Sequence, residues 1–290
     1  MTGLAVADRA HQLDLVFGRT GGTGPTRLVS RRVAYPFSVA DVFRLDRTSR
    51  DPASRDRATV ILQSASGGLF EDEDLSLSIA AQQGSQARFT TPSAAVVHGM
   101  PGGGMACQDV TLKADEDARL EYLPKPLILF PGSRLRQRIV IEASEDATVL
   151  ACDGFLMHTP RGAEGSFDWL DTSTEIRRPG GLVVARERMR VTGAAIAQGS
   201  AGLSGSFRAF GWIALIGGTY EAEAEAAVLD AIAGCGEAVY AGASRLPGDC
   251  GVMVRIAARD GGALLPALEA GVLAVQGVLK LSRPMALRAD

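Results

Sequence analysis

The sequence contains few of the residue types that bind metals tightly or close disulfides. Among 290 residues there are three histidines and four cysteines, and the cysteines stand far apart in the chain, as Cys107, Cys152, Cys235 and Cys250. No Cys-x-x-Cys pair occurs, so the spacing argues against a secreted disulfide framework and against a zinc site of the usual His and Cys kind. We therefore expect reduced, buried thiols and no tightly bound cofactor.

Long hydrophobic runs and a targeting segment are also missing. The apolar runs, such as Leu127–Phe130 and Ile213–Ile216, are far short of the ~20 residues that a membrane-spanning helix needs. Leu4–Ala7 is followed at once by Asp8 and Arg9, which leaves neither a basic leader nor a hydrophobic stretch long enough for a signal peptide. We expect a cytoplasmic protein without a membrane partner.

Neither sign of charge is in large excess. Lysine and arginine total 30 against 33 aspartates and glutamates, a net charge of −3, so the chain creates no broad positive field to hold a phosphate backbone. Nucleic acid is not an expected partner. With 46% hydrophobic residues the chain is too apolar to be disordered, and at ~150 residues per domain it fits one large domain or two small ones.

What is present, from about residue 75 onward, is the alternation typical of strands. Leu75, Leu77 and Ile79 fall on one face of an extended segment, with serines between them on the other face. This pattern predicts half-buried strands as far as about Met157, because a strand with one buried face alternates apolar and polar residues.

A weak internal repeat of about thirty residues organises these strands. Each copy reads as strand, polar turn, strand: Ile79-x-Ala81 with Ala87-x-Phe89, Val110-x-Leu112 with Ala118-x-Leu120, and Ile139-x-Ile141 with Ala147-x-Val149. The turns are too polar to be buried and too short to hold a helix: Gln82–Ser85, Asp115–Asp117 and Ser144–Asp146. Since one hairpin cannot bury its apolar face, the copies should lie side by side or in stacked sheets.

The fold class that follows is mainly β, a layered, β-helix-like stack of hairpins with a C-terminal α+β portion of about two helices. We divide the chain into a flexible N-terminal segment, residues 1–27, a layered β region, residues 28–198, and a C-terminal α+β portion, residues 199–290, packed on the same core. In the last portion we expect strands at Phe207–Ile216 and Gly251–Ala258, and helices at Glu221–Ala233 and Ala263–Leu279.

The second of these helices carries one apolar stripe. Its members recur at three and four residues along the helix: Leu265, Leu268, Val272, Val275 and Leu279. The periodicity fits a helix packed on the protein's own sheet, and it fits equally a helix that docks against a partner. The stripe therefore supplies candidate partner-binding residues, with packing on the chain's own core as the alternative.

No arrangement typical of nucleophilic catalysis is apparent. Ser204 lies in Gly202–Gly205, which misses the Gly-x-Ser-x-Gly spacing of a nucleophile elbow, and the glycine-rich segment around Gly21 lacks the Lys-Ser/Thr that closes a phosphate loop. Cys152 and His158 have no third group to orient them. We expect a protein that is not an enzyme.

Three carboxylates fall where polar residues are not expected. Asp74 closes an acidic run at the start of a strand, Asp153 follows the apolar run Val149–Cys152, and Glu187 lies within the arginine-rich Arg186–Arg190. A solvated strand end or a surface ion pair is the simplest interpretation of each. Any of them inside the fold must be paired with arginine, hydrogen-bonded or bathed in water, because an unpartnered buried carboxylate is costly.

Several segments, in one order, resemble the family of the urease accessory protein UreD, also called UreH. The matching segments are Gly67–Leu75, Arg88–Ala95, Leu120–Pro124, Ile128–Arg136, Ser244–Gly248 and Val252–Arg255, and a terminal helix follows them. The resemblance covers roughly residues 28 to 285. A run of motifs in one order is more specific than any single motif.

The resemblance implies a non-enzymatic role and a particular set of partners. Proteins of this family bind urease apoprotein and join UreF, and through it the GTPase UreG, in a hetero-oligomer with two-fold symmetry that delivers Ni²⁺ to urease. It further implies a water-filled passage lined by acidic residues that carries Ni²⁺ in transit. By motif match, Asp74, Asp153 and Glu187 are candidates for this metal path, with Glu121 and His158 as secondary candidates.

The scarcity of strong metal ligands is consistent with transit. Imidazole and thiolate clusters would hold Ni²⁺ too tightly to release it, whereas carboxylates and water attract a hydrated dication and let it move on. Two alternatives stay open. One is a metal-dependent hydrolase that uses His98, His158 and Asp153, and the other is a β-structured module that binds a small ligand at its glycine-rich tips.

Overall fold

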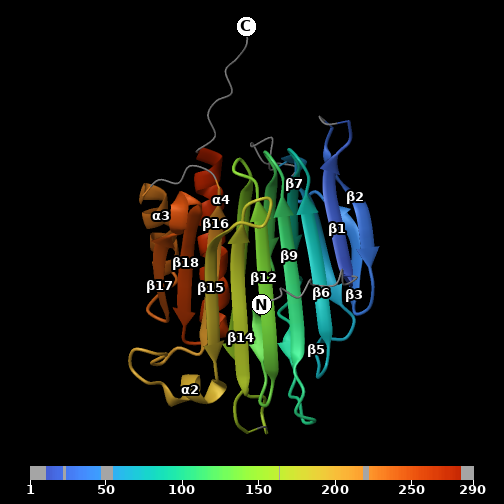
Figure 1. Cartoon of the computed structure of the whole chain (residues 1–290). Helices are drawn as coiled ribbons and strands as arrows, with labels where there is room; N and C mark the ends of the chain where they lie inside the picture. The colour runs from blue at the N-terminus through green and yellow to red at the C-terminus, as the bar shows by residue number, and fades with distance from the viewer. Residues whose placement is uncertain (1–10, 22–23, 47–54, 163, 218–221, 282–290) are drawn as a thin grey trace, which may run out of the picture.

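Two β-sheets stacked face to face form the body of the molecule. The computed structural model describes residues 11–21, 24–46, 55–162, 164–217 and 222–281. One sheet has seven strands and the other eleven. Figure 1 shows the seven-stranded sheet toward the viewer, with helix α4 (Gly261–Leu281) behind it and helix α3 (Ala222–Ala233) at the left edge of the view. Both helices pack on strands of the eleven-stranded sheet. We name the two sheets the open sheet and the covered sheet.

The strand order in each sheet is fixed by hydrogen bonding between neighbours. The open sheet runs β15 (Val183–Val191), β14 (Trp169–Arg177), β12 (Arg134–Ala143), β9 (Ala106–Ala114), β6 (Asp74–Ala81), β1 (Leu13–Arg19) and β2 (Thr26–Val33). The covered sheet runs β17 (Val239–Arg245), β18 (Gly251–Ala258), β16 (Ala209–Ile216), β13 (Thr148–Met157), β10 (Arg119–Leu123), β7 (Gln86–Thr90), β4 (Ala58–Ser64) and β3 (Phe37–Phe43), with the short β5 (Gly68–Leu69), β8 (Val96–Val97) and β11 (Leu127–Leu129) beside it.

The predicted repeat forms three successive coils, and the predicted fold class is confirmed. Strands β6, β9 and β12 pair in parallel in the open sheet, and β7, β10 and β13 pair in parallel in the covered sheet. Each polar turn leads from one sheet to the other, so the two strands of a copy face each other across the core. The turns are closed by backbone hydrogen bonds, for example from Ala118 N to Asp115 O at 3.0 Å.

The register differs from the predicted alignment in one copy. Ile79 pairs with Leu112, and Leu112 with Ile141, so the first copy is shifted by two residues against the spacing that we read from the sequence. Because side chains alternate with a period of two, a shift by two residues leaves every side chain on its predicted face. The alternation therefore predicted the buried face correctly even where the alignment was wrong.

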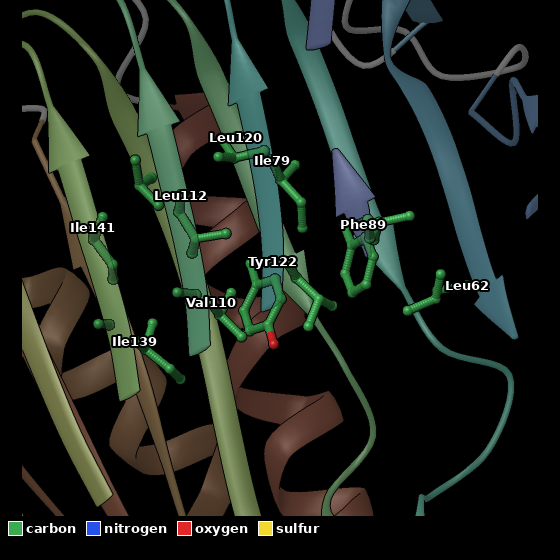
Figure 2. Packing of buried hydrophobic residues seen from close by; sticks show 14 of the residues in the cluster. Leu62, Ile79, Phe89, Val110, Leu112, Leu120, Tyr122, Ile139 and Ile141 are labelled. Carbon is green, nitrogen blue, oxygen red and sulfur yellow. The ribbon is translucent and has the colours of Figure 1, made fainter. Parts of the chain in front are cut away.

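The core lies between the sheets and is built from the inward side chains of these coils. Ile79, Leu112 and Ile141 lie side by side and are completely buried, as Figure 2 shows. Phe89 stacks on Tyr122 with ring centroids 5.3 Å apart. Burial of each such side chain contributes roughly 1.5–3 kcal/mol. The parallel coils are held together mainly by this continuous apolar ladder.

The N-terminal part of the chain departs from the flexible segment that we expected. Residues 1–10 lie outside the described residues, but β1 pairs with both β2 and β6 in the open sheet. Leu13, Leu15 and Phe17 are fully buried. Their spacing of two residues, with Asp14 and Val16 only partly buried between them, carries the same strand signal as the later copies, whereas the nearby glycines had suggested an irregular segment.

The C-terminal portion continues the covered sheet through β16, which pairs antiparallel with β13. The two strands and two helices expected here are present, with β18 matching its predicted bounds. Strand β17 and the short helix α2 (Gly193–Gln198) were not predicted. In β17 only every second residue is partly shielded, so its apolar alternation is weak.

Helix α4 is long and apolar enough to span a membrane by length and composition, which the short apolar runs in the sequence had not suggested. Its window Gly261–Leu279 has a mean hydropathy of 1.6, and 33% of it is buried in the molecule. Leu264 and Ala267 are fully buried in a second hydrophobic cluster beneath it. A Cβ at Gly271 would lie 2.5 Å from Ile213 Cδ1, so this glycine lets the helix approach the sheet closely.

Candidate functional site

Three neighbouring cavities lie along the interior of the sandwich. The first has a volume of about 530 Å³, the second about 140 Å³ and the third about 180 Å³. The first lies among β4, β6, β7 and the loop that carries Ser93, and the third lies between β15 and the segment from Ser244 to Pro247. The three cavities therefore extend across the sheets from one end of the strand order toward the other.

Adjacent cavities share walls, and a carboxylate lies in each shared wall. Leu127, Gln137 and Asp153 line both the first and the second cavity. Thr174, Glu187 and Arg255 line both the second and the third. Two of the three predicted metal-path residues are thus brought to the two junctions of this row of cavities.

Strand register explains why polar side chains gather here. We call a layer the set of inward side chains that lie at the same register on β6, β9, β12, β14 and β15. The first layer contains, in that strand order, Leu75, Gln108, Gln137, Thr172 and Met189. The second layer contains Leu77, Val110, Ile139, Thr174 and Glu187, and the third layer is entirely apolar and contains Ile79, Leu112, Ile141, Ile176 and Ala185. The Gln137 amide donates to Gln108 Oε1 at 3.1 Å. Polar groups thus cross the core through the first two layers only.

Asp153 occupies the centre of the row. It belongs to β13, is 7% exposed, and accepts a hydrogen bond from Gly154 N to its Oδ1 at 2.8 Å. Burial raises the pKa of Asp153 to about 7, against the opposing effects of the Gly154 amide and the Gln137 side chain. The carboxyl therefore changes between neutral and charged forms close to physiological pH.

Glu187 lies opposite Thr174 on the neighbouring strand. Its Oε1 accepts from Arg255 Nε at 3.1 Å, and its Oε2 is buried with no hydrogen-bond partner among the described residues. A buried carboxylate oxygen without a protein donor is unfavourable unless water or a cation meets it. Glu187 lines both the second and the third cavity, which supplies room for either near this side chain.

Asp74, the third predicted metal-path residue, has a different position. It lies at the exposed start of β6 and is not among the residues that line the three cavities. Its backbone carbonyl accepts from the Gln12 side chain at 3.0 Å. Its role on a metal path stays a prediction.

Glu121, a secondary candidate, is fully buried in an ion cluster on the covered sheet. Its Oε2 accepts from Arg88 Nε at 2.7 Å and from Gln276 Nε2 of α4 at 2.9 Å, and its Oε1 lies 2.9 Å from an Arg119 nitrogen and 3.4 Å from one of Arg57. Although burial opposes it, the three arginines lower the pKa of Glu121 below its ordinary value. This arrangement fixes α4 to the sheet.

The histidines lie away from the cavities. His158 follows β13 and is exposed, and Phe130 lies between its ring and that of His98, with centroids 5.8 Å from each. Within the described ranges, no three side chains of His, Cys, Asp or Glu come together as a metal-binding group. The hydrolase alternative required His98, His158 and Asp153 in one site, and the described structure does not gather them.

The apolar stripe on α4 packs mainly on the chain's own core. Leu268 and Val275 are 4% and 2% exposed in the second hydrophobic cluster, and Val272 and Leu279 pack against it. Leu265 is half-buried. Among the leucines of the helix whose side chains the structure describes, Leu273 is the most exposed, at 67%. Of the two interpretations left open by the periodicity, the structure therefore favours internal packing for Leu268 and Val275.

Sequence reasoning missed the uncharged polar residues that line the row. Gln137 and Thr174 stand at inward positions of otherwise apolar alternations, so an interrupted apolar face was the signal available. Chemically, the row offers amide, hydroxyl and carboxylate oxygens. Such donors suit hydrated divalent cations and bind Ni²⁺ less tightly than imidazole or thiolate does.

Comparison with known proteins gives a consistent result. A family model described as UreD urease accessory protein matches residues 9–289. The urease accessory protein UreD 1 of Methylorubrum populi is 38% identical over 269 residues, which cover 92% of this chain and 87% of that protein. UreD 1 of Pseudomonas syringae pv. syringae is 37% identical over 248 residues, which cover 85% of this chain and 85% of that protein. UreD 3 of a Bradyrhizobium species is 32% identical over 262 residues, which cover 90% of this chain and 89% of that protein.

Proposed function

Because the chain belongs to the UreD family of urease accessory proteins and therefore has a role in urease maturation, we propose that it is a non-enzymatic scaffold and Ni²⁺ conduit. In this proposal it binds urease apoprotein and the UreF/UreG complex, the latter through UreF, in the cytoplasm. Ni²⁺ is a cargo that passes along the row of cavities.

The observation that carries the conduit proposal is the position of the two carboxylates. Asp153 and Glu187 lie in the walls that adjacent cavities share, and the uncharged polar lining is amide and hydroxyl. The cationic lining residues are Lys125 in the first cavity, Arg255 in the second and third, and Arg186 and Arg245 in the third. A dication that leaves bulk water needs compensating oxygen ligands at the narrowest points, where its hydration shell is most disturbed. One carboxylate at each junction meets that need without building a site that retains the ion.

The protonation behaviour of Asp153 fits a transient ligand. With a pKa of about 7 the carboxyl spends part of its time neutral, so an empty conduit does not hold a fixed buried charge. An arriving dication stabilises the carboxylate form and displaces the proton. When the ion moves on, reprotonation of Asp153 lowers the attraction that would pull it back.

A small-ligand binding module is the second candidate, favoured by one observation. The first cavity, at about 530 Å³, has the volume of many small-molecule sites and a partly apolar lining that includes Leu62, Phe89 and Tyr122. Saturable binding of a metabolite that shifts the melting temperature of the chain would support it. In the conduit proposal the same space is filled by water.

The test of the conduit narrows the second cavity without changing any charge. Thr174→Phe places a ring in a space of about 140 Å³, and Thr111→Phe makes the same change on the outer face of β9. Each variant is co-expressed with urease subunits, UreF and UreG, and the nickel content and activity of purified urease are measured.

We expect Thr174→Phe to co-purify with urease apoprotein while nickel content and urease activity fall by about tenfold or more, the effect of roughly 1.4 kcal/mol on a barrier. Thr111→Phe should match the wild type. Overpacking in the interior destabilises by about 1–3 kcal/mol, so the melting temperature of each complex is recorded alongside. Full nickel loading with a folded Thr174→Phe variant would rule out this row of cavities as the path.

A further inference from the structure

Six arginines cluster on the outer face of the open sheet. Along β15, Glu187 and Met189 point toward the cavities. Because side chains alternate along a strand, Arg186, Arg188 and Arg190 point outward. The neighbouring strands β14 and β12 add outward arginines at matching register. We name the set the arginine face: Arg136, Arg138, Arg177, Arg186, Arg188 and Arg190.

The arginine face has too few carboxylates to neutralise it. Glu175 lies beneath it and contacts Arg177, Arg186 at 3.1 Å and Arg138 at 3.6 Å. Asp171 pairs with Arg188 at 3.0 Å. With Arg134 included, the outward positions of these three strands hold seven arginines against three carboxylates, Glu142, Asp171 and Glu175, an excess of four positive charges. Two carboxylates beside the strands offset part of this excess: Asp168 pairs with Arg134 at 2.7 Å, and Asp109 of β9 lies opposite Arg138.

These contacts orient the guanidinium groups without covering them. The side chains of Arg186 and Arg188 are 59% and 65% exposed, whereas Asp171 and Glu175 are 16% and 8% exposed beneath them. Hydrogen bonding from Arg188 lowers the pKa of Asp171, so the anchoring carboxylate stays charged across the neutral range. The outward N–H groups remain available to a second surface.

An aromatic side chain completes this surface. Trp169 begins β14 on the same outer face, is half-buried, and has the Arg190 guanidinium carbon 5.6 Å from its ring centroid. Tryptophan and arginine are enriched among the residues that dominate protein–protein binding energy. A Trp and Arg pair already held in place loses little conformational freedom on binding.

No described helix covers this face, because α3 and α4 pack on the covered sheet. Figure 1 shows β15, β14 and β12 toward the viewer, with α4 behind them and α2 near their lower ends. The arginine face also borders the row of cavities, since Arg186 lines the third cavity together with Arg245, Arg255 and Glu187.

We propose that the arginine face docks an acidic surface of urease apoprotein. The proposal rests on the proposed function, because binding of urease apoprotein is part of that function. The positive excess determines the charge of the complementary surface, and the flat sheet with its half-buried tryptophan suits a protein surface better than a narrow groove would. An acidic surface bound to the arginine face would also lower the positive potential that the arginines lining the third cavity present to a dication.

The test neutralises part of the face and uses a matched set of arginines as control. The variant R186Q/R188Q/R190Q removes three charges from β15, and R27Q/R31Q/R32Q removes three exposed charges from β2, at the other edge of the same sheet. The probe is nickel-free urease apoprotein, added to the full chain co-expressed with UreF. Affinity is measured from low to high salt, with a melting curve for each variant.

We expect the β15 variant to bind urease apoprotein at least about tenfold more weakly at low salt, with a flatter salt dependence than the wild type. The β2 variant should bind like the wild type. If R186Q/R188Q/R190Q does not fold, the single substitution Arg190→Gln is measured in its place and has to weaken binding in the same direction, since Arg190 forms no ion pair with the described residues and contacts the Trp169 ring.

Each other outcome overturns the inference in a distinct way. Equal binding by the wild type and the β15 variant would refute the arginine face while the proposed function stands. Absence of wild-type binding would count against the scaffold function itself, and the docking proposal would fall with it. Displacement of urease apoprotein by a short DNA duplex would assign the face to nucleic acid, and loss of self-association in the β15 variant alone would assign it to a second copy of the chain.

Discussion

Substituting Asp153 by asparagine should stabilise the fold and impair the function. The change keeps the size of the side chain and the acceptor for Gly154 N, but removes the charge. In the folded chain burial raises the pKa of Asp153 to about 7, from an ordinary value of 3.8. The charged carboxylate is therefore less favourable in the fold than in the unfolded chain.

The magnitude follows from proton linkage. Because the folded-state pKa is raised, the folded protein binds the proton more tightly, and its stability relative to the asparagine variant falls as pH rises from about 4 to about 7. A difference of about three pKa units corresponds to about 4 kcal/mol at pH 8. Water in the adjoining cavities offsets part of the desolvation, so about 4 kcal/mol is an upper limit.

Urea unfolding from pH 4 to pH 8 measures the effect. The unfolding free energy of Asp153→Asn minus that of the wild type should be near zero at pH 4 and rise to a plateau above pH 7. Asp146→Asn changes an exposed carboxylate in the turn before β13 and should show no such difference. A difference that does not vary with pH would refute the claim that Asp153 lies in a poorly solvated interior.

The same variant tests function separately from stability. Loss of the carboxylate at the first junction should reduce nickel loading of co-expressed urease by about tenfold, equivalent to roughly 1.4 kcal/mol on a barrier, although the protein is more stable. Undiminished loading in a stabilised Asp153→Asn variant would exclude Asp153 as a ligand in transit and leave its burial without a functional explanation.

Two further predictions concern the structure that positions the row, in addition to the Thr174→Phe and arginine-face experiments. Glu121→Ala leaves buried arginines without their carboxylate and should destabilise the fold by about 3–5 kcal/mol in urea unfolding; a change below about 1 kcal/mol would mean that the cluster is well hydrated. Leu268→Ala should cost about 2–5 kcal/mol, whereas Leu273→Ala, on the exposed side of α4, should stay within about 0.5 kcal/mol, and equal effects would contradict the packing of that helix.

The stacked coils could be predicted from the sequence because they rest on local rules. Alternation at Leu75, Leu77 and Ile79 and the polar turns between strands each reflect short-range physics, and successive copies reinforce one another. The register of the first copy could not be derived in this way. A two-residue shift leaves the hydrophobic pattern unchanged, so only packing between coils selects the alignment.

The candidate site was predictable in part, and for a physical reason. Asp153 and Glu187 stood out because a charge inside an apolar or arginine-rich strand is unusual, and both line the cavities. Gln137, Thr174 and Arg255 were missed because uncharged or paired residues interrupt a strand pattern only weakly. Their proximity depends on which strands become neighbours, which is a long-range property of the fold.

The order of residues across the layers is compatible with the proposed path, because the polar side chains do not interrupt the apolar layer that stabilises the fold. The layer through Ile79, Leu112 and Ile141 is apolar from β6 to β14 and supplies the continuous ladder that the coils need. Polar side chains enter only the layers beside it, at Gln137 in one and at Glu187 in the next. An ion on this route would therefore move across strands and shift by one layer between the two carboxylates. The apolar layer thus stabilises the fold, whereas the polar layers line the proposed Ni²⁺ path. Removing the charge of Asp153 should therefore raise the free energy of unfolding and lower nickel loading.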